Sequence, residues 1–508
     1  MIKPWLWAAG LLVGTAAKAQ AQGIDQQIND ALAPVARALS AIIFYALPID
    51  GVEVPLVVIW LIAGAVFCTF YFRVLSPAAL WHAVRLIKGD FSDPNAQGEI
   101  SHFRALATAL SGTVGVGNIG AVAVLVVLGG PGAVFWMALA GVLGASVKFA
   151  ECILGVKYRN HYSDGTVSGG PMYYLSKGIS EHHHPLLGRF VGGLYAASIV
   201  VACLGIGNMF QANQAYAQFA NVTGGDAGFM GDKGWLFGIA LAGLVAAVVI
   251  GGIRSIARVT SKVVPFMAVL YMGGSLTVIG MHIEALPAVF AAIFSQAFNP
   301  EGMAGGMLGV MVLGFRRAVF SNEAGLGSAA IAHSAVRTNE PVTEGLVGLL
   351  EPIIDTVVIC TMTALVILVT VYDPNLHHHG GGLNGVTLTA AAFETVALWS
   401  GIPLSLAVVL FAFSTMIAWA YYGLKGWTYF LGESRISHIA FNSIFCFFVF
   451  LGCTMELDAI LAFSDALIFA MVVPNVLGLY LMAPVVRREF QQYWRRLQNG
   501  EIAPTRRK

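Results

Sequence analysis

The feature of this chain best suited to chemistry is a run of peptide groups rather than a set of reactive side chains. The stretch Gly112-Thr113-Val114-Gly115-Val116-Gly117-Asn118-Ile119-Gly120 lies inside an otherwise apolar segment. A glycine in a helix interior costs about 1 kcal/mol relative to alanine, so this stretch predicts a broken helix. In a membrane, the N–H and C=O groups freed by such a break need new partners, and a ligand or an ion can supply them.

Two further polar segments could complete such a site. Asn208, Gln211 and Asn213 bring three amide side chains into one apolar segment, which predicts either the interior of a helix bundle or hydrogen bonds between helices. The segment 303–334 is interrupted twice, at Gly314-Phe315-Arg316-Arg317 and at Ser321-Asn322-Glu323-Ala324-Gly325-Leu326-Gly327-Ser328. We expect a second broken helix there, and an ordinary kink is the alternative.

The charged residues of the apolar segments are interpreted as structural or gating groups. Lys148 and Glu151 are three positions apart, so they could pair on one helix face. Glu323 and His333 are expected in a gate or in packing, not as metal ligands. A gating or proton-sensing role is the hypothesis for the two remaining carboxylates, Glu351 and Asp355.

Composition places the chain in the membrane class. Of its 508 residues 57% are hydrophobic and only 11% are charged, whereas soluble domains carry about a quarter charged residues. The six cysteines lie in apolar stretches without CxxC spacing, which is typical of packing residues. We find neither a nucleophile–base set nor a HExxH motif. The sequence therefore predicts an all-α membrane protein that is not an enzyme, needs no cofactor and binds no nucleic acid.

Hydropathy predicts about eleven transmembrane helices, each long enough to cross about 30 Å of hydrocarbon. They are Val54–Phe72, Phe103–Leu128, Gly132–Lys157, Phe190–Ala220, Trp235–Ile253, Val263–His282, Met303–Ser334, Glu344–Val371, Ile402–Gly423, His438–Cys453 and Ala459–Ala483. The two interrupted helices are five spans apart and cross the membrane in opposite directions. This arrangement favours a five-plus-five inverted repeat.

The predicted organisation has six parts. Residues 1–21 resemble a signal peptide, residues 22–53 form an external amphipathic segment with a helix over Gln26–Leu47, and residues 54–72 form an extra transmembrane helix. The two five-helix repeats span residues 103–282 and 303–483, and residues 484–508 are a basic tail.

The positive residues predict the orientation. Leaving aside Lys3, Lys18 and Lys148, Arg37 and Lys233 fall on one side, and the other 23 of the 28 Lys and Arg fall at or near the opposite side. By the positive-inside rule the crowded side is cytoplasmic. We therefore expect a multi-pass protein of a bacterial inner membrane, with the N-terminus outside and the C-terminus inside.

Several ordered motifs resemble one family. They are the stretch Ala107–Gly120, Gly129-Gly-Pro-Gly-Ala-Val-Phe-Trp-Met137, Gly169-Gly-Pro-Met-Tyr-Tyr174, Val319-Phe-Ser-Asn-Glu-Ala-Gly-Leu-Gly-Ser328 and Ile331-Ala-His333. Together they resemble the alanine or glycine:cation symporter family, from about Val54 to Pro484. The resemblance implies a LeuT-type fold and sodium-coupled uptake of small neutral amino acids. The chain departs from the usual pattern in its signal-like start and at Arg316-Arg317, where one arginine followed by glycine is more typical.

The resemblance also implies a site. A zwitterion needs N–H donors for its carboxylate, which the break near Val116 and Gly117 would supply. It also needs acceptors for its ammonium, which carbonyls and side chains around Gly314 and Phe315 could supply. Sodium prefers oxygen ligands. The sodium ligands that the resemblance implies are the carbonyls of Ser111 and Val114 and the hydroxyls of Ser414 and Thr415. The candidate substrate-binding residues are Thr113, Gly115, Val116, Gly117, Asn118, Asn208, Gln211, Asn213, Gly314, Phe315, Thr415 and Trp419.

Some assignments stay open. Thr113 and Asn118 could form a second cation site or contact the substrate. Trp419 could wall the pocket or simply pack in the membrane. A proton-coupled symporter and a non-transporting membrane amino-acid sensor are the alternative functions. No soluble signalling domain follows the last span, which argues against a sensor.

Overall fold

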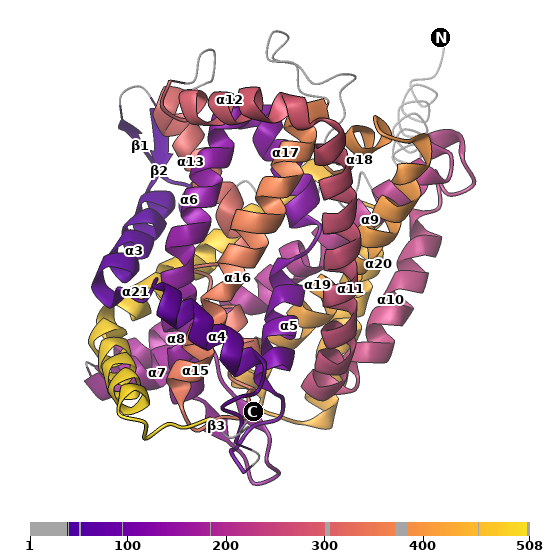
Figure 1. Cartoon of the computed structure of the whole chain (residues 1–508). Coiled ribbons are helices and arrows are strands. Elements are labelled where there is room, and N and C mark those ends of the chain that lie inside the picture. The colour runs from indigo at the N-terminus through magenta and orange to yellow at the C-terminus, as the bar shows by residue number, and fades with distance from the viewer. Residues whose placement is uncertain are drawn as a thin grey trace, which may run out of the picture.

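Helices make up nearly all of the described chain, and most run between two opposite faces of the molecule (Figure 1). The computed structural model describes residues 38, 40–49, 52–93, 95–182, 184–299, 305–370, 385–455 and 457–504. We call one end the α12 face, after the helix Leu286–Phe298 that lies across it. The opposite end is the β3 face, after the strand Asn160–His161. Residues 1–21 lie outside the described residues, as does most of the predicted helix Gln26–Leu47.

The chain begins with a hairpin and two helices. These are β1 (Ala46–Ile49), β2 (Val52–Pro55), α3 (Leu56–Phe72) and α4 (Pro77–Ile87). The antiparallel β1–β2 hairpin occupies residues for which the end of the amphipathic helix and the start of the first span are predicted. The second hairpin strand therefore shortens the first span by two residues, because the helix starts only at Leu56.

The first repeat occupies the next part of the chain. Its elements are α5 (His102–Thr113), η1 (Gly117–Ala121), α6 (Val122–Lys157), β3, β4 (Val167–Ser168), α7 (Pro171–His182), α8 (Pro185–Leu204), η2 (Gly205–Met209), α9 (Phe210–Val222), η3 (Gly225–Ala227), α10 (Gly234–Val249) and α11 (Gly252–Met281). The short η4 (Ile283–Ala285) and α12 lead to the second repeat.

The second repeat follows α12. Its elements are α13 (Gly306–Asn322), α14 (Ala329–His333), α15 (Pro341–Gly348), α16 (Leu350–Pro352), η5 (Ile353–Cys360), α17 (Thr361–Thr370), α18 (Val386–Glu394), η7 (Leu398–Ser400), α19 (Gly401–Leu431), α20 (Arg435–Gly452) and α21 (Leu457–Gln498).

The predicted fold class is confirmed, and each predicted span has a helical counterpart. Seven helices in the described ranges are long and apolar enough to cross a membrane, or eight if the bent pair α3 and α4 counts as one. One of the seven, the helix Gly117–Lys157, contains two of the predicted spans, because Gly130 has φ 60° and ψ −168° and is followed by Pro131. The other predicted spans are short or broken helices.

Three spans extend further than hydropathy predicts. Helix α11 starts at Gly252 rather than Val263, since Arg254, Arg258 and Lys262 lie in its first turns and lower the local hydropathy. Helix α19 continues to Leu431, and α21 continues to Gln498. Long Lys and Arg side chains can reach water from a helix end, so a helix need not stop where its charges begin.

The two broken helices lie at the centre of the fold. The first unwinds after Thr113, and the helical conformation resumes at Gly117. The second unwinds after Asn322 and resumes at Ala329. Just outside them, the Glu99 amide donates to the Ala335 carbonyl (2.8 Å) and the Arg337 amide to the Ile100 carbonyl (2.7 Å). The entry to the first broken helix therefore lies beside the exit from the second, as expected for inverted repeats.

The predicted second break at Gly314–Phe315 is wrong. Helix α13 is continuous through Arg316 and Arg317, and a Cβ on Gly314 would lie 2.6 Å from Trp136 Cβ, so this glycine serves close helix packing. The other predicted interruption, Ser321–Ser328, is confirmed: the chain unwinds at residues 323–328, where Glu323 has φ 58°, Gly325 φ 93° and Gly327 φ 78°. Arg316 and Arg317 are thus helix residues, and they do not belong to the loops on the side of the membrane where most positive residues are expected.

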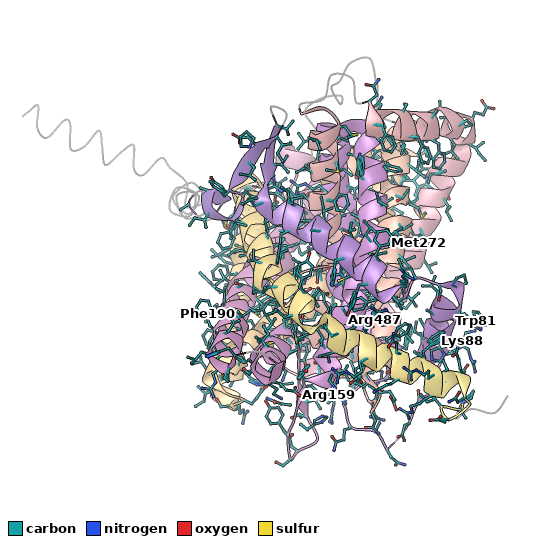
Figure 2. The ribbon with its side chains drawn as sticks, turned by 90° about the vertical axis from the view of Figure 1, so that its left-hand side faces the viewer. Trp81, Lys88, Arg159, Phe190, Met272 and Arg487 are labelled. Carbon is teal, nitrogen blue, oxygen red and sulfur yellow. The ribbon has the colours of Figure 1, made fainter. Side chains whose placement is uncertain are left out.

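Helix α4 lies at the edge of the β3 face and is held by α21. It is bent by 94° from α3 and begins with Ser76, whose hydroxyl accepts from the Ala79 amide, followed by Pro77. His82 Nε2 lies 2.8 Å from the Tyr493 hydroxyl of α21. In Figure 2, α21 (yellow), which carries Arg487, runs obliquely toward the helix that carries Trp81 and Lys88.

Candidate functional site

The freed peptide groups of the first break are buried and face side-chain oxygens. The Gly115 amide donates to Asn118 Oδ1 (2.9 Å), and the Val116 amide donates to Gln211 Oε1 of α9 (3.1 Å). Both residue pairs are almost completely inaccessible to solvent. The break therefore frees two backbone N–H donors, and two of the predicted substrate-binding side chains, Asn118 and Gln211, accept hydrogen bonds from them.

Glycine at position 115 allows three elements to pack closely there. A Cβ on Gly115 would lie 2.4 Å from Thr415 Oγ1 and 3.1 Å from Gln211 Oε1. Neither contact leaves room for a methyl group. The first break, α9 and α19 thus pack against one another at Gly115, which brings three of the predicted residues together.

The predicted sodium ligands on α5 and α19 also lie together. Thr415 Oγ1 donates to the Ser111 carbonyl (2.9 Å), and Ser111 Oγ donates to the Ser414 carbonyl (2.5 Å). The Ser414 hydroxyl turns back along its own helix and donates to Phe411 O (3.0 Å). The end of α5 and the middle of α19 are therefore joined by two hydrogen bonds, with four oxygen atoms close by.

A buried carboxylate lies on the other side of Asn118. Asp355 of η5 accepts from Asn118 Nδ2 (2.6 Å), Ser321 Oγ (2.7 Å) and Thr356 Oγ1 (2.8 Å). The donors come from both broken helices and from η5, and every residue of this group is buried. The sequence suggested a gating or proton-sensing role for Asp355, from a carboxylate within an apolar span, and it did not indicate Ser321 and Thr356 as its partners.

The π-helical segments of the described chain border this site. They are η1 directly after the first break, η2 just before Gln211, and η5, which carries Asp355. A π-helical turn widens the helix and redirects side chains by part of a turn, and such turns are frequent at functional sites. Hydrophobic periodicity cannot predict them, since they insert one residue without changing the composition.

Trp419 forms one wall of the site. Its indole N–H donates to Glu323 Oε1 in the second break (2.8 Å), and the ring is so close to η2 that a Cβ on Gly207 would lie 2.1 Å from it. Ser328 also donates to Glu323. The tryptophan is thus packed between both breaks rather than in contact with lipid.

Toward the α12 face, aromatic residues cover the first break. Phe320 of α13 lies 3.6 Å from the Cβ position of Gly117, and its ring meets that of Phe210 edge-on at 5.2 Å between centroids. Beyond them, Asp465 of α21 pairs with Arg316 (2.6 Å) and Arg317 (3.5 Å). The arginine pair therefore joins α13 to α21 above the site.

The remaining predicted residues have other partners. Asn208 donates to Phe445 O (2.7 Å) and Asn213 donates to Met455 O (2.6 Å). These two side-chain amides therefore form hydrogen bonds to other parts of the fold, which agrees with the predicted alternative of hydrogen bonds between helices. Phe315 is buried within the continuous α13 and, like Gly314, contributes no freed carbonyl. The Thr113 hydroxyl bonds back to Ala109 O (3.3 Å), and the Val114 amide bonds to Leu110 O (2.7 Å).

The predicted pairing of Lys148 with Glu151 is wrong. Lys148 Nζ lies 3.4 Å from Glu351 Oε2, while Glu151 accepts from Asn475 Nδ2 (2.7 Å) and the Gly325 amide (3.0 Å). Lys148 and Glu151 lie on one face of α6, but Lys148 contacts Glu351 of α16 and Glu151 contacts Asn475 of α21. Spacing along a helix could not reveal this choice.

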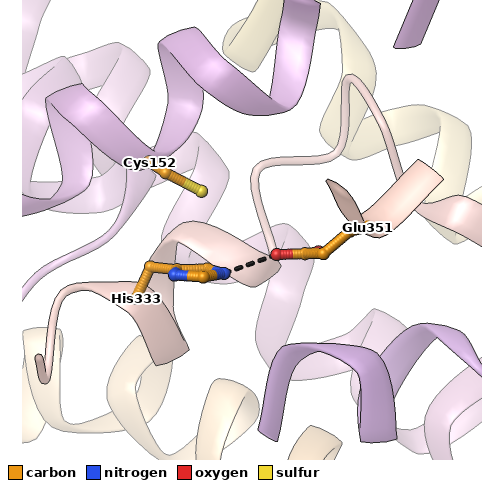
Figure 3. Close-up of side chains that lie close together, drawn as sticks. All are labelled: Cys152, His333 and Glu351. Carbon is orange, nitrogen blue, oxygen red and sulfur yellow. Dashed lines mark hydrogen bonds and ion pairs between the residues drawn. The ribbon is translucent and has the colours of Figure 1, made fainter. Parts of the chain in front are cut away.

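One buried group has the residue types of a metal site. Ligand atoms of Cys152, His333 and Glu351 lie within 4.8 Å of one another (Figure 3). Both ring nitrogens of His333, however, already face carboxylates of Glu344 and Glu351. Since a metal needs a free ring nitrogen, the arrangement does not fit an ion.

Two broken helices at the centre of a bundle of apolar helices, beside buried oxygen atoms, are typical of secondary transporters. The structure is similar to the crystal structure of MhsT in complex with L-phenylalanine, with a TM-score of 0.52 at 15% identity, over 77% of this chain and 99% of that chain. This likeness shows the LeuT-type fold.

The chain belongs to the Sodium:alanine symporter family, whose profile matches residues 44–507. It is 38% identical to the sodium/alanine symporter AgcS of Methanococcus maripaludis, over 86% of this chain and 94% of the relative. It is also 31% identical to the probable sodium/glutamine symporter GlnT of Bacillus subtilis, over 88% and 89% of the two chains. The protein is thus a multi-pass, cation-coupled amino-acid symporter and not an enzyme, as the sequence motifs predicted.

Proposed function

We propose that this protein carries alanine and glycine into the cell together with sodium, by alternating access. The observation that carries the proposal is the convergence of Gly115, Gln211 and Thr415 beside the freed amide of Val116. Side chains packed this closely around the freed amide favour a small substrate. The relative at 38% identity is named a sodium/alanine symporter, which supports the same substrate.

The substrate carboxylate is proposed to bind the amides of Val116 and Gly117. The Val116 amide now donates to Gln211 Oε1, so a carboxylate would replace this amide oxygen. Gln211 Nε2 donates one hydrogen to Ile206 O (3.0 Å) and has a second that could bond to the carboxylate. The adjacent helix η1 directs its N-terminus to the same point, where its dipole favours negative charge.

Sodium, as co-transported substrate, is proposed to bind the carbonyls of Ser111 and Val114 and the hydroxyls of Thr415 and Ser414. The Thr415–Ser111 contact already holds two of these oxygens together. Ser414 must turn away from Phe411 O to take part. A second cation site would comprise Asp355 and Asn118 with the Thr113 carbonyl, because a buried carboxylate surrounded only by neutral donors favours a nearby positive charge.

The membrane potential is sufficient to drive this reaction. Each sodium charge that enters gains about 2.3 kcal/mol per 100 mV. This corresponds to roughly fifty-fold accumulation of a neutral zwitterion, since 1.4 kcal/mol is a factor of ten. We place the β3 face in the cytoplasm of a bacterial cell, the N-terminus outside after removal of residues 1–21 as a signal peptide, and the protein in the inner membrane.

The experiment is uptake of labelled alanine into proteoliposomes that contain the full chain. An inward sodium gradient is compared with an inward proton gradient at the same membrane potential. We expect accumulation only with sodium, and competition by glycine but not by glutamine. Accumulation driven by protons without sodium would instead establish the proton-coupled alternative.

A further inference from the structure

A continuous chain of buried ionisable side chains lies on the β3 side of the site and takes no part in the proposed binding of substrate. His102 Nδ1 bonds to Glu344 Oε1, and Glu344 Oε2 lies 2.5 Å from His333 Nδ1. His333 Nε2 in turn lies 2.5 Å from Glu351 Oε1, whose second oxygen lies 3.4 Å from Lys148 Nζ. Each of these side chains is at most 3% exposed.

The chain joins the two broken helices. His102 is the first residue of α5, and His333 is the last residue of α14, so they belong to the β3-side halves of the first and second broken helix. Glu344 of α15 bonds to both histidines. The two half-helices are thus held together by one carboxylate.

Counting hydrogens shows that this geometry needs an additional proton. The three imidazole–carboxylate contacts each require one hydrogen, because two acceptors cannot bond to each other. Two neutral imidazole rings supply only two hydrogens. The third resides on a histidine ring or on one of the carboxyl groups.

Charge balance leads to the same conclusion independently. With two carboxylates, the Lys148 ammonium and the additional proton, the five-residue chain is neutral. Without that proton the five residues carry one net negative charge, and their side chains have almost no contact with water in the described structure. An unbalanced buried charge is strongly destabilising.

Other ionisable groups lie against the chain from the elements packed around it. They are Glu151 and Cys152 of α6, Glu323 of the second break, Arg159 just before β3, and Tyr422 of α19. Glu151 and Glu323 have their own donors in Asn475 and Trp419. Arg159 donates to the carbonyls of Ser334 (2.8 Å) and Val336 (2.6 Å) just beyond α14. These groups therefore do not supply the missing hydrogen.

We propose that His333, with Glu344 and Glu351, is a proton-binding site, and that its proton holds the β3-side halves of both broken helices together. Loss of the proton removes one hydrogen bond and leaves a net charge, so the packing of α5 and α14 loosens. Under the proposed function and orientation, this site makes opening toward the cytoplasm sensitive to pH.

The test uses Glu351→Gln, which removes the need for the proton. The amide group introduced by this substitution can donate to His333, so neutral rings then satisfy every contact, and the chain is neutral without an added proton. The matched control is Glu489→Gln, which breaks a surface pair with Lys157 (2.7 Å) by the same chemical change.

The first measurement is thermal unfolding of the purified full-length protein from about pH 6 to about pH 9, where imidazole–carboxylate protons titrate. If only the folded state holds this proton, the ratio of folded to unfolded protein falls by up to about tenfold for each unit by which the pH rises. We expect this decline in the unaltered protein and in Glu489→Gln, but not in Glu351→Gln. An equal slope in Glu351→Gln, or no slope in the unaltered protein, overturns the proposal.

If Glu351→Gln does not unfold cooperatively, Glu344→Gln provides the same test at the other ring nitrogen. The second measurement is sodium-driven uptake of labelled alanine over the same pH range, where we expect the pH dependence to flatten in the variant. Absence of alanine uptake with a normal unfolding result contradicts the proposed function alone. A variant with an unchanged pH profile of uptake contradicts the link between this proton and gating.

Discussion

The Thr415 hydroxyl donates a 2.9 Å hydrogen bond to the Ser111 carbonyl, across 304 positions of sequence. This contact joins α19 to the last turn of α5, beside the first break. It brings two of the oxygens proposed for sodium into one place before an ion enters.

Replacing Thr415 by valine keeps the shape and removes one of these oxygens. Loss of a ligand worth about 1.4 kcal/mol raises the sodium concentration for half-maximal uptake by about tenfold. The measurement is alanine uptake at graded sodium concentrations. Thr277→Val is the control, because the Thr277 hydroxyl is exposed and bonds only to Gly273 O of its own helix. An unchanged sodium dependence in Thr415→Val removes this residue from the cation site.

Gly115→Ala should close the substrate space without disturbing the rest of the fold. The new methyl group would lie 2.4 Å from Thr415 Oγ1, so one of the two groups must move into the space proposed for substrate. We expect uptake to fall nearly to background while the thermal midpoint changes little. Gly243→Ala is the matched control, since a Cβ there has nothing within 4 Å. Normal uptake by Gly115→Ala would place the substrate elsewhere.

Asp355→Asn removes a buried charge and keeps the size of the side chain. If Asp355 balances a transported cation, its neutralisation should lower sodium-driven uptake by about a hundredfold, which corresponds to about 3 kcal/mol. Uptake and equilibrium alanine binding are measured together. Thr356→Val, which keeps the charge and removes one donor to this carboxylate together with the acceptor of Asn322 Nδ2 (2.9 Å), should have a much smaller effect on sodium-driven uptake. Equal effects of the two substitutions would indicate a packing role.

The turn between α19 and α20 should lose stability in acid. Burial raises the pKa of Glu433, but the hydrogen bond from His438 and the Lys425 ammonium outweigh it and lower the pKa to about 2 from an ordinary 4.5. Because the folded-state pKa is depressed, this contribution is present above pH 4.5 and is lost as the pH falls toward 2. Thermal unfolding between these values should show a smaller acid decline in Glu433→Gln than in the unaltered protein.

The sequence by itself determined the class of protein and the position of the first break. Four glycines near Asn118 make a continuous helix unfavourable, and this local property does not depend on neighbours. The apolar runs predicted the spans for the same reason, since burial in lipid is decided residue by residue. The ordered motifs indicated the family, and with it the Ser111–Thr415 pairing.

The tertiary structure decided which polar groups meet. Of the two interruptions predicted in the second helix, only the one at Glu323 unwinds, and its positive φ is accompanied by a hydrogen bond from the distant Trp419 as well as one from the nearby Ser328. Lys148 likewise pairs with Glu351 of α16 rather than with Glu151, although Glu151 lies only three positions away on the same helix. A buried charge is stabilised by whichever partner the packing of helices brings within about 4 Å, and that partner is not encoded in local spacing.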